Sequence, residues 1–135
     1  MTAYADHLAP SAADLLAMAS RARATLPPQF RPAAEQVLLL VEEMADEELC
    51  DEMEIDDPFE LTGLYEGIPL TEKSVADQPM GPDRIILFRR AILDEWIGRG
   101  DVELDRLVAH VLVHEMAHHF GWSDDQIAQI DRWWE

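Results

Sequence analysis

The chain has 135 residues, with 28 acidic and 10 basic side chains and a formal net charge of −18. This length fits one compact domain, and a hydrophobic fraction of 48 % with 28 % charged residues is typical of a soluble globular protein. The acidic excess argues against nucleic acid and anionic membranes as partners, because both are bound by clustered Lys and Arg. The negative charge would attract a cationic peptide partner electrostatically. The more general interpretation is that an acidic surface keeps the protein soluble.

Cysteine usage and the apolar runs restrict the class of protein further. Cys50 is the only cysteine, which excludes an internal disulfide and a zinc site built from two or more cysteines. This usage fits the cytosol, so we expect a cytoplasmic protein. The first ten residues lack a basic region followed by an apolar run, and we therefore expect no signal peptide. Residues 37–41, the longest strongly apolar run, are too few to span a bilayer.

The N-terminal half predicts one helix, one strand and an acidic segment. Ser11 is expected to cap a helix that ends near Thr25, before two prolines. Residues 37–41 are expected to lie in a buried strand that begins near Ala34, although periodicity alone does not separate a strand from a helical segment. A short acidic helix is predicted over residues 46–53.

The acidic segment continues to residue 60. Residues 42–60 carry eleven Asp and Glu and neither Lys nor Arg. We interpret this segment as a solvated face or loop, with recruitment of a basic substrate as the weaker alternative.

The next part of the chain alternates turns with one clear strand. Residues 63–70 predict a turn-rich extended segment, and residues 74–83 predict a mobile loop because they contain two prolines and a glycine. Residues 84–90 are rich in β-formers and predict a strand. A short helix is expected over residues 91–97, ending at Gly98.

A longer helix is expected to begin after Asp101 and to end at Gly121. Between residues 107 and 117 it is apolar apart from His110, His114 and Glu115. A helix that is apolar on nearly all sides is buried, and buried imidazoles and carboxylates need partners. A divalent cation would supply that partner.

The spacing of His114 and His118 supports such a site. In a helix they lie one turn apart on the same face, so both rings can approach one ion at about 2 Å, the zinc–nitrogen distance. In a strand they would lie roughly 13 Å apart and the site would be lost. Glu115 occupies the general-base position of the His-Glu-x-x-His motif, where it can accept a proton from a zinc-polarised water and pass it to a leaving amine.

The third ligand is predicted to be Asp124, six residues after His118 and beyond a turn at Gly121. An alternative is that Ser123 and Gln126 form a capping box, in which case Asp124 only favours the N-terminus of a last helix over residues 124–134. The fallback ligands are Asp125, Asp131 and His119.

His110 lies about 12 Å along the helix axis from His118, too far for one ion to be shared by all three histidines. We therefore interpret His110 as a core histidine or as a group that supports the ligands.

Three stretches of the chain, residues 113–125, 63–72 and 82–89, resemble the compact bacterial zincin-like metallopeptidase family. The resemblance covers most of the chain from about residue 57 to residue 125. It implies a minimal α+β zincin fold, in which a small twisted sheet lies over the metal-binding helix. It also implies strand character for residues 37–41. Together with the length of the chain, this leads us to expect a single zincin-like domain over residues 1–135.

The resemblance implies zinc as the cofactor, with His114, His118 and Asp124 as ligands and Glu115 as the base. In zincins generally, an edge strand just before the active helix binds substrate by strand addition, and residues 84–90 are expected to be that strand. The methionine turn of metzincins is missing, because no Met follows Asp124.

We therefore expect a zinc peptidase that acts on peptides or protein segments. Tyr65, His119 and Arg84 are candidates for stabilising the oxyanion, and each of them has a structural role as its alternative. Two other functions stay open: a non-catalytic module that binds metal or a partner, and a metal-dependent amidase that acts on a non-peptide substrate.

Overall fold

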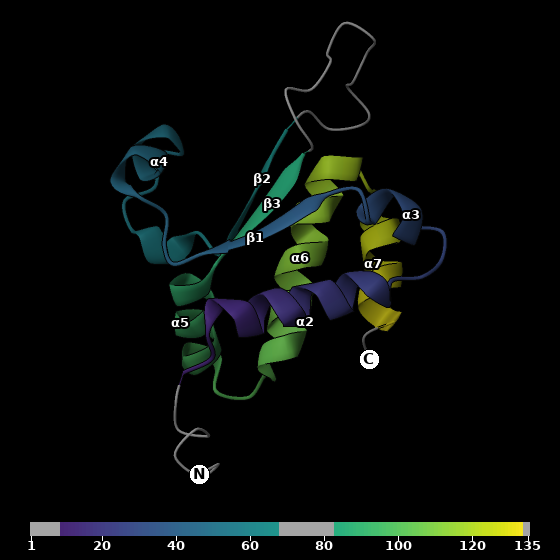
Figure 1. The fold of residues 1–135 in the computed structure, drawn as a ribbon, viewed down its shortest axis with the longest axis horizontal. Helices are drawn as coiled ribbons and strands as arrows, with labels where there is room; N and C mark the ends of the chain where they lie inside the picture. The colour runs from purple at the N-terminus through teal and green to yellow at the C-terminus, as the bar shows by residue number, and fades with distance from the viewer. Residues whose placement is uncertain (1–8, 68–82, 134–135) are drawn as a thin grey trace, which may run out of the picture.

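The computed structural model describes residues 9–67 and 83–133, which form a small three-stranded sheet with helices around it (Figure 1). The elements in chain order are α2 (Ala12–Ala24), α3 (Arg31–Ala34), β1 (Leu38–Glu42), α4 (Glu47–Glu52), the 3-10 helix η1 (Pro58–Glu60), β2 (Gly63–Glu66), β3 (Arg84–Phe88), α5 (Arg89–Arg99), α6 (Leu104–Phe120) and α7 (Asp124–Trp133). This composition confirms the predicted α+β class. None of the helices in the described segments is long and apolar enough to cross a bilayer.

The sheet has the strand order β1-β3-β2, with β1 parallel and β2 antiparallel to β3. The expectation that residues 84–90 form an edge strand is therefore wrong, because β3 is paired on both sides. Ile85, Ile86, Leu87 and Phe88 are all buried, and a continuous apolar run of this kind is typical of a strand covered on both faces. The edge strand that contacts α6 is β2.

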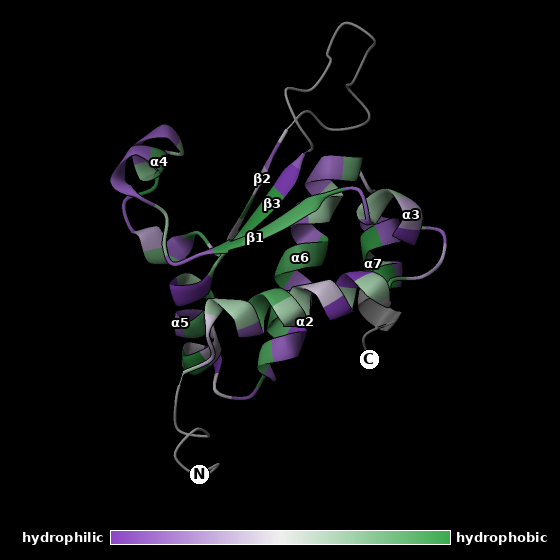
Figure 2. Ribbon diagram, viewed as in Figure 1, coloured by the Kyte–Doolittle hydropathy of each residue, from purple (hydrophilic) through white to green (hydrophobic). Residues whose placement is uncertain are grey.

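The main core lies between the sheet and the crossing helices α2 and α6. Its members include Leu15 of α2, Ile85 and Leu87 of β3, and Leu112 and Met116 of α6, all of them completely or almost completely buried. Figure 2 shows the hydrophobic colour concentrated along β1, β3 and the middle of α6. A smaller apolar cluster, which includes Cys50 of α4 and Phe88 of β3, adds a second packed region.

Several predicted helix ends are confirmed. Ser11 and Asp14 form a reciprocal capping box at the start of α2. Gly121 ends α6 in the left-handed region with a φ of 66°. Ser123 and Gln126 exchange hydrogen bonds at the start of α7, which confirms the capping box predicted there.

Several boundaries differ from the predictions. Strand β1 begins at Leu38 and not near Ala34, because residues 31–34 form the short helix α3 with a proline in its first turn. Strand β3 ends at Phe88 and not at residue 90, because α5 already begins at Arg89. Helix α5 passes through Gly98 and ends at Arg99, with Gly100 as its C-cap at a φ of 76°.

Helix α6 is capped at Glu103, so the prediction of Asp101 as its N-cap is wrong. Residues 101–103 link the two helices, and the Trp96 indole N–H donates to the Val102 carbonyl in this link at 2.9 Å. Of the predicted loop 74–83, only Asp83 lies among the described residues.

The packing of α6 predicts a large stability cost for Leu112→Ala. Leu112 is fully buried where α6 contacts the sheet and α2, so the substitution leaves a cavity that costs about 2–5 kcal/mol in the free energy of unfolding. Urea denaturation measures this difference. Ile97→Ala is the control, because Ile97 is 74 % exposed on α5 and its loss is expected to change stability by about 0.5 kcal/mol or less. Equal stabilities for the two variants would contradict this account of the core.

Candidate functional site

One side of α6 carries three histidines in an exposed row. His110, His114 and His118 follow one another at intervals of four residues, and all three side chains are exposed. The residues between them that point elsewhere, such as Val113 and Met116, are buried. The expectation that the two ligand histidines are buried is therefore wrong. The sheet and the neighbouring helices cover the other sides of α6 and leave the side with the histidines exposed. Their four-residue spacing within one continuous helix is as predicted.

Glu115 lies beside this row, half-buried and turned toward β2. A Cβ atom on Gly63 of β2 would lie 3.1 Å from the Glu115 Cγ atom, so the glutamate stem rests against the strand. The main-chain N–H of Tyr65 donates a hydrogen bond to the Glu115 carboxylate. Burial raises the pKa of Glu115 above its ordinary value, and this effect outweighs the opposing influence of His118, the Tyr65 N–H and His114.

A small cavity opens next to His114 and Glu115. Its volume is about 250 Å³, somewhat below that of typical small-molecule sites. Its lining comes from α5, α6 and the residue before β2: Thr62, Glu95, Arg99, His110, Val111, His114 and Glu115. The rings of His110 and His114 lie side by side there, with centroids 4.2 Å apart. The interpretation of His110 as a core histidine is therefore wrong, since its side chain faces solvent.

His119 lies outside the exposed row, because consecutive helical side chains point about 100° apart, and it is buried. Its Nδ1 atom lies 3.2 Å from the Asp83 Oδ2 atom, and this pair joins the end of α6 to the start of β3. Asp83 also fills the space beside Gly67, whose φ is 142° and where a Cβ atom would overlap the Asp83 carboxylate.

This buried pair was not predicted from the sequence. The only signal for it was the doubled histidine, because consecutive helical residues point about 100° apart and cannot both join one exposed row.

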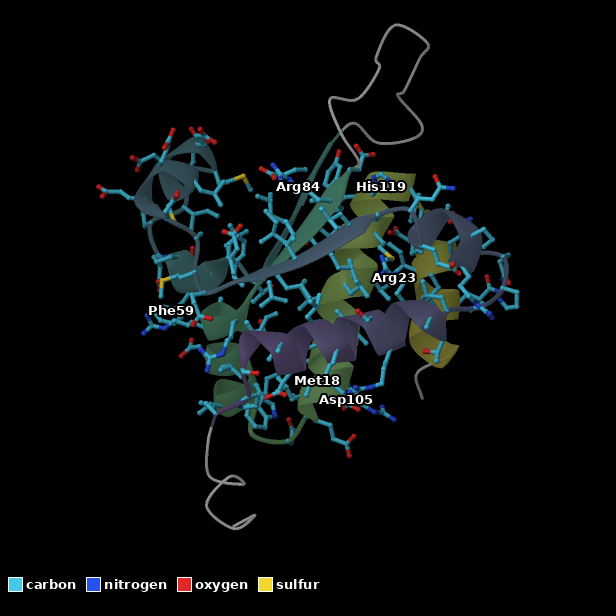
Figure 3. All side chains as sticks on the ribbon, viewed as in Figure 1. Met18, Arg23, Phe59, Arg84, Asp105 and His119 are labelled. Atoms are coloured by element: carbon cyan, nitrogen blue, oxygen red, sulfur yellow. The ribbon has the colours of Figure 1, made fainter. Side chains whose placement is uncertain are left out.

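The three oxyanion candidates differ in their surroundings. Arg84 is paired with Glu66 at 2.7 Å, and His119 is paired with Asp83. Figure 3 shows Arg84 and His119 at the same end of the molecule. Tyr65 is half-buried, and its ring centroid lies 6.3 Å from that of His118. Of the three, Tyr65 combines partial exposure with proximity to the histidine row.

Asp124 is the first residue of α7 and is exposed. Within residues 9–67 and 83–133, no group of three or more His, Cys, Asp or Glu side chains converges on one metal position. Asp124 therefore does not join His114 and His118 in this arrangement. Two exposed imidazoles one turn apart, with a carboxylate beside them, still fit two ligands and the base of a zinc site by their chemistry.

The environment of Glu115 predicts that this residue destabilises the metal-free protein at neutral pH. Because burial raises the folded-state pKa above the unfolded value, the folded chain binds more protons between the two values, and stability falls as the pH rises through that window. Glu115→Gln keeps an acceptor for the Tyr65 N–H and removes the charge. We expect the variant to be more stable than the wild type near pH 7, with a smaller difference near pH 4, in chemical denaturation with a chelator present.

Glu48→Gln on the exposed start of α4 is the control and is expected to show no such gain. A Glu115→Gln variant that is less stable than the wild type near pH 7 would show that the carboxylate is well compensated in the metal-free fold.

Comparison with known proteins identifies the family. The model of one protein family, described as zincin-like metallopeptidase, matches residues 34–134. A search of curated proteins found no match. The matched region is well over half of the chain and contains all three strands and the whole of α6. The predicted family membership is thus confirmed: the chain belongs to the zincin-like metallopeptidase family.

Proposed function

We propose that this protein is a zinc-dependent peptidase that hydrolyses peptide bonds with Glu115 as the general base. The observation that carries the proposal is the arrangement on α6, where His114 and His118 are exposed one turn apart and Glu115 is held beside them against β2. Family membership supports a metallopeptidase-type activity in general. The substrate, the ligands and the roles of individual residues are our proposals.

The zinc ligands in this proposal are His114, His118 and Asp124. When bound, zinc supplies a Lewis acid that polarises the scissile carbonyl and lowers the pKa of water to about 7. Asp124 stands at the start of α7, separated from α6 by the turn at Gly121. Its participation therefore requires the first turn of α7 to approach the histidine row, which is why we rank it below the two histidines.

Glu115 carries the proton in the proposed reaction. Its carboxylate accepts a proton from the attacking water and returns it to the amine that leaves. A carboxyl group whose pKa is raised by burial is better suited to this exchange near neutral pH than an exposed one. The contact with β2 fixes the carboxylate near the two imidazoles.

The proposed substrate is an extended peptide that pairs with the edge strand β2. This strand contacts α6, and the main-chain groups of Gly63 and Tyr65 turn away from β3. Because the Tyr65 N–H donates to Glu115, the Gly63 N–H and the carbonyls of Gly63 and Tyr65 are the groups proposed to pair with the peptide. Strand addition at this edge would place the peptide backbone next to Glu115. The cavity of about 250 Å³ beside Glu115 has room for one substrate side chain. The net charge of −18 favours peptides that carry basic residues.

Glu115→Gln is predicted to abolish cleavage while the protein still binds zinc. Removal of a general base costs about 10²- to 10⁴-fold in rate, whereas the imidazole ligands are unchanged. The measurement is cleavage of a broad peptide library by zinc-loaded protein, with the zinc content determined in parallel. Glu48→Gln is the matched control and is expected to keep full activity, because Glu48 lies on α4.

His118→Ala is predicted to reduce zinc binding instead, because it removes one of the two imidazoles. Wild-type cleavage rates for Glu115→Gln, or wild-type zinc affinity for His118→Ala, would rule out the proposed roles.

A second candidate function is a non-catalytic module that binds metal or a partner. The observation that favours it is that no three-ligand group assembles within the described part of the chain. Zinc binding by the wild type without cleavage of any library peptide, together with full function of Glu115→Gln in the cell, would favour this second role. An amidase acting on a non-peptide substrate shares the same site chemistry and is tested by the same variants on small amides.

A further inference from the structure

Gly63 is the position of β2 on which the Glu115 side chain rests. Gly63 is buried, and a Cβ atom built on it would lie 3.1 Å from Glu115 Cγ and 2.8 Å from Val111 Cγ1. Both neighbours belong to α6, so the helix approaches the strand backbone at the point where no side chain intervenes. Glycine within a strand often marks such a close approach.

The pairing of β2 with β3 determines which main-chain groups point toward Glu115. The Phe88 N–H donates to the Thr62 carbonyl at 2.9 Å, and the two residues are opposite each other in the antiparallel register. Hydrogen-bonded and non-hydrogen-bonded pairs alternate along such a ladder, so the N–H and C=O groups of Gly63 and Tyr65 turn away from β3. The Tyr65 N–H is the group that donates to the Glu115 carboxylate.

We propose that Gly63 and the main-chain N–H of Tyr65 are positioning groups for Glu115: the missing side chain at Gly63 lets the glutamate stem rest on β2, and the Tyr65 N–H fixes its carboxylate. This inference rests on the proposed function of Glu115 as the base. It assigns to the edge strand a role in orienting the base in addition to the proposed pairing with substrate. Neither group needs to touch the substrate for this role.

The competing explanation is that Gly63 only allows Val111 to pack. A Cβ atom built on Gly63 would lie 2.8 Å from Val111 Cγ1 and 3.1 Å from Glu115 Cγ, so it would clash with Val111 first. A loss of stability in a Gly63 variant would therefore not separate the two explanations. One experiment must therefore measure the hydrogen bond between the Tyr65 N–H and the Glu115 carboxylate alone. A separate variant must remove the clash between a side chain at position 63 and Val111.

Amide hydrogen exchange in the zinc-free protein follows the carboxylate contact directly. In Glu115→Ala, the Tyr65 amide is expected to exchange about tenfold faster than in the wild type, the effect of losing one hydrogen bond to a charged group. The Phe88 amide is the internal reference, because it donates to Thr62 and reports the stability of the β2–β3 ladder. An unchanged ratio of the Tyr65 rate to the Phe88 rate would overturn the proposal. This variant keeps Gly63, so it does not add a steric clash to the strand.

Gly63→Ala then tests the steric part in the zinc-loaded enzyme. We expect kcat on a library peptide to fall by about 100-fold, as expected for a reacting group displaced by a fraction of an ångström to 1 Å, while zinc affinity stays unchanged. Gly98→Ala is the matched control, because a Cβ atom at Gly98 of α5 meets nothing within 4 Å. It is expected to leave both quantities as in the wild type.

The double variant Gly63→Ala/Val111→Ala separates packing from positioning. It relieves the shorter contact and leaves the new methyl group against Glu115. Because Val111 also lines the cavity, the reference is Val111→Ala alone. Stability equal to that of Val111→Ala with a kcat still far below it supports the proposal, whereas equal stability and equal kcat show that Gly63 serves packing only and overturn it. If the wild type cleaves no peptide, the proposed function fails, and the exchange experiment still decides whether β2 holds Glu115.

Discussion

The packing of α6 against the sheet and α2 is the constraint on which the rest of the site depends. Burial of Leu112, Val113 and Met116 fixes the rotation of the helix about its axis, and this rotation leaves one row of positions exposed. His114 and His118 lie in that row, and Glu115, the residue after His114, points toward β2. The apolar core therefore determines where the two imidazoles and the carboxylate stand relative to one another.

Glu115 is a partly buried carboxyl group that lowers the stability of the fold when it is ionised. Burial raises the pKa of this carboxyl group, and the Tyr65 N–H offsets only part of that effect. A conflict of this kind between local energetics and the fold is expected at a functional site. The buried pair of His119 and Asp83 is different, since it joins the end of α6 to β3 and gives this helix a second attachment to the sheet.

The features that depend on the spacing of nearby residues could be predicted from the sequence. The interval between His114 and His118, the helix-ending Gly121 and the capping box at Ser123 are all short-range patterns, and the structure has each of them. The central place of β3 could have been inferred from its unbroken apolar run, but the expected edge-strand role came from the family resemblance and was wrong. Contacts between distant segments, such as Gly63 with Glu115 and Asp83 with His119, depend on the tertiary fold and left almost no trace in the sequence.

The central claim is that one zinc ion is held by His114 and His118 beside Glu115. The most direct test is anomalous scattering at the zinc absorption edge from crystals of the zinc-loaded protein. We expect a single peak about 2.0–2.1 Å from one ring nitrogen of each histidine, with Glu115 close by but not bound as a primary ligand. A map with no peak between these two rings, or with zinc only on the acidic segment 42–60, would contradict it.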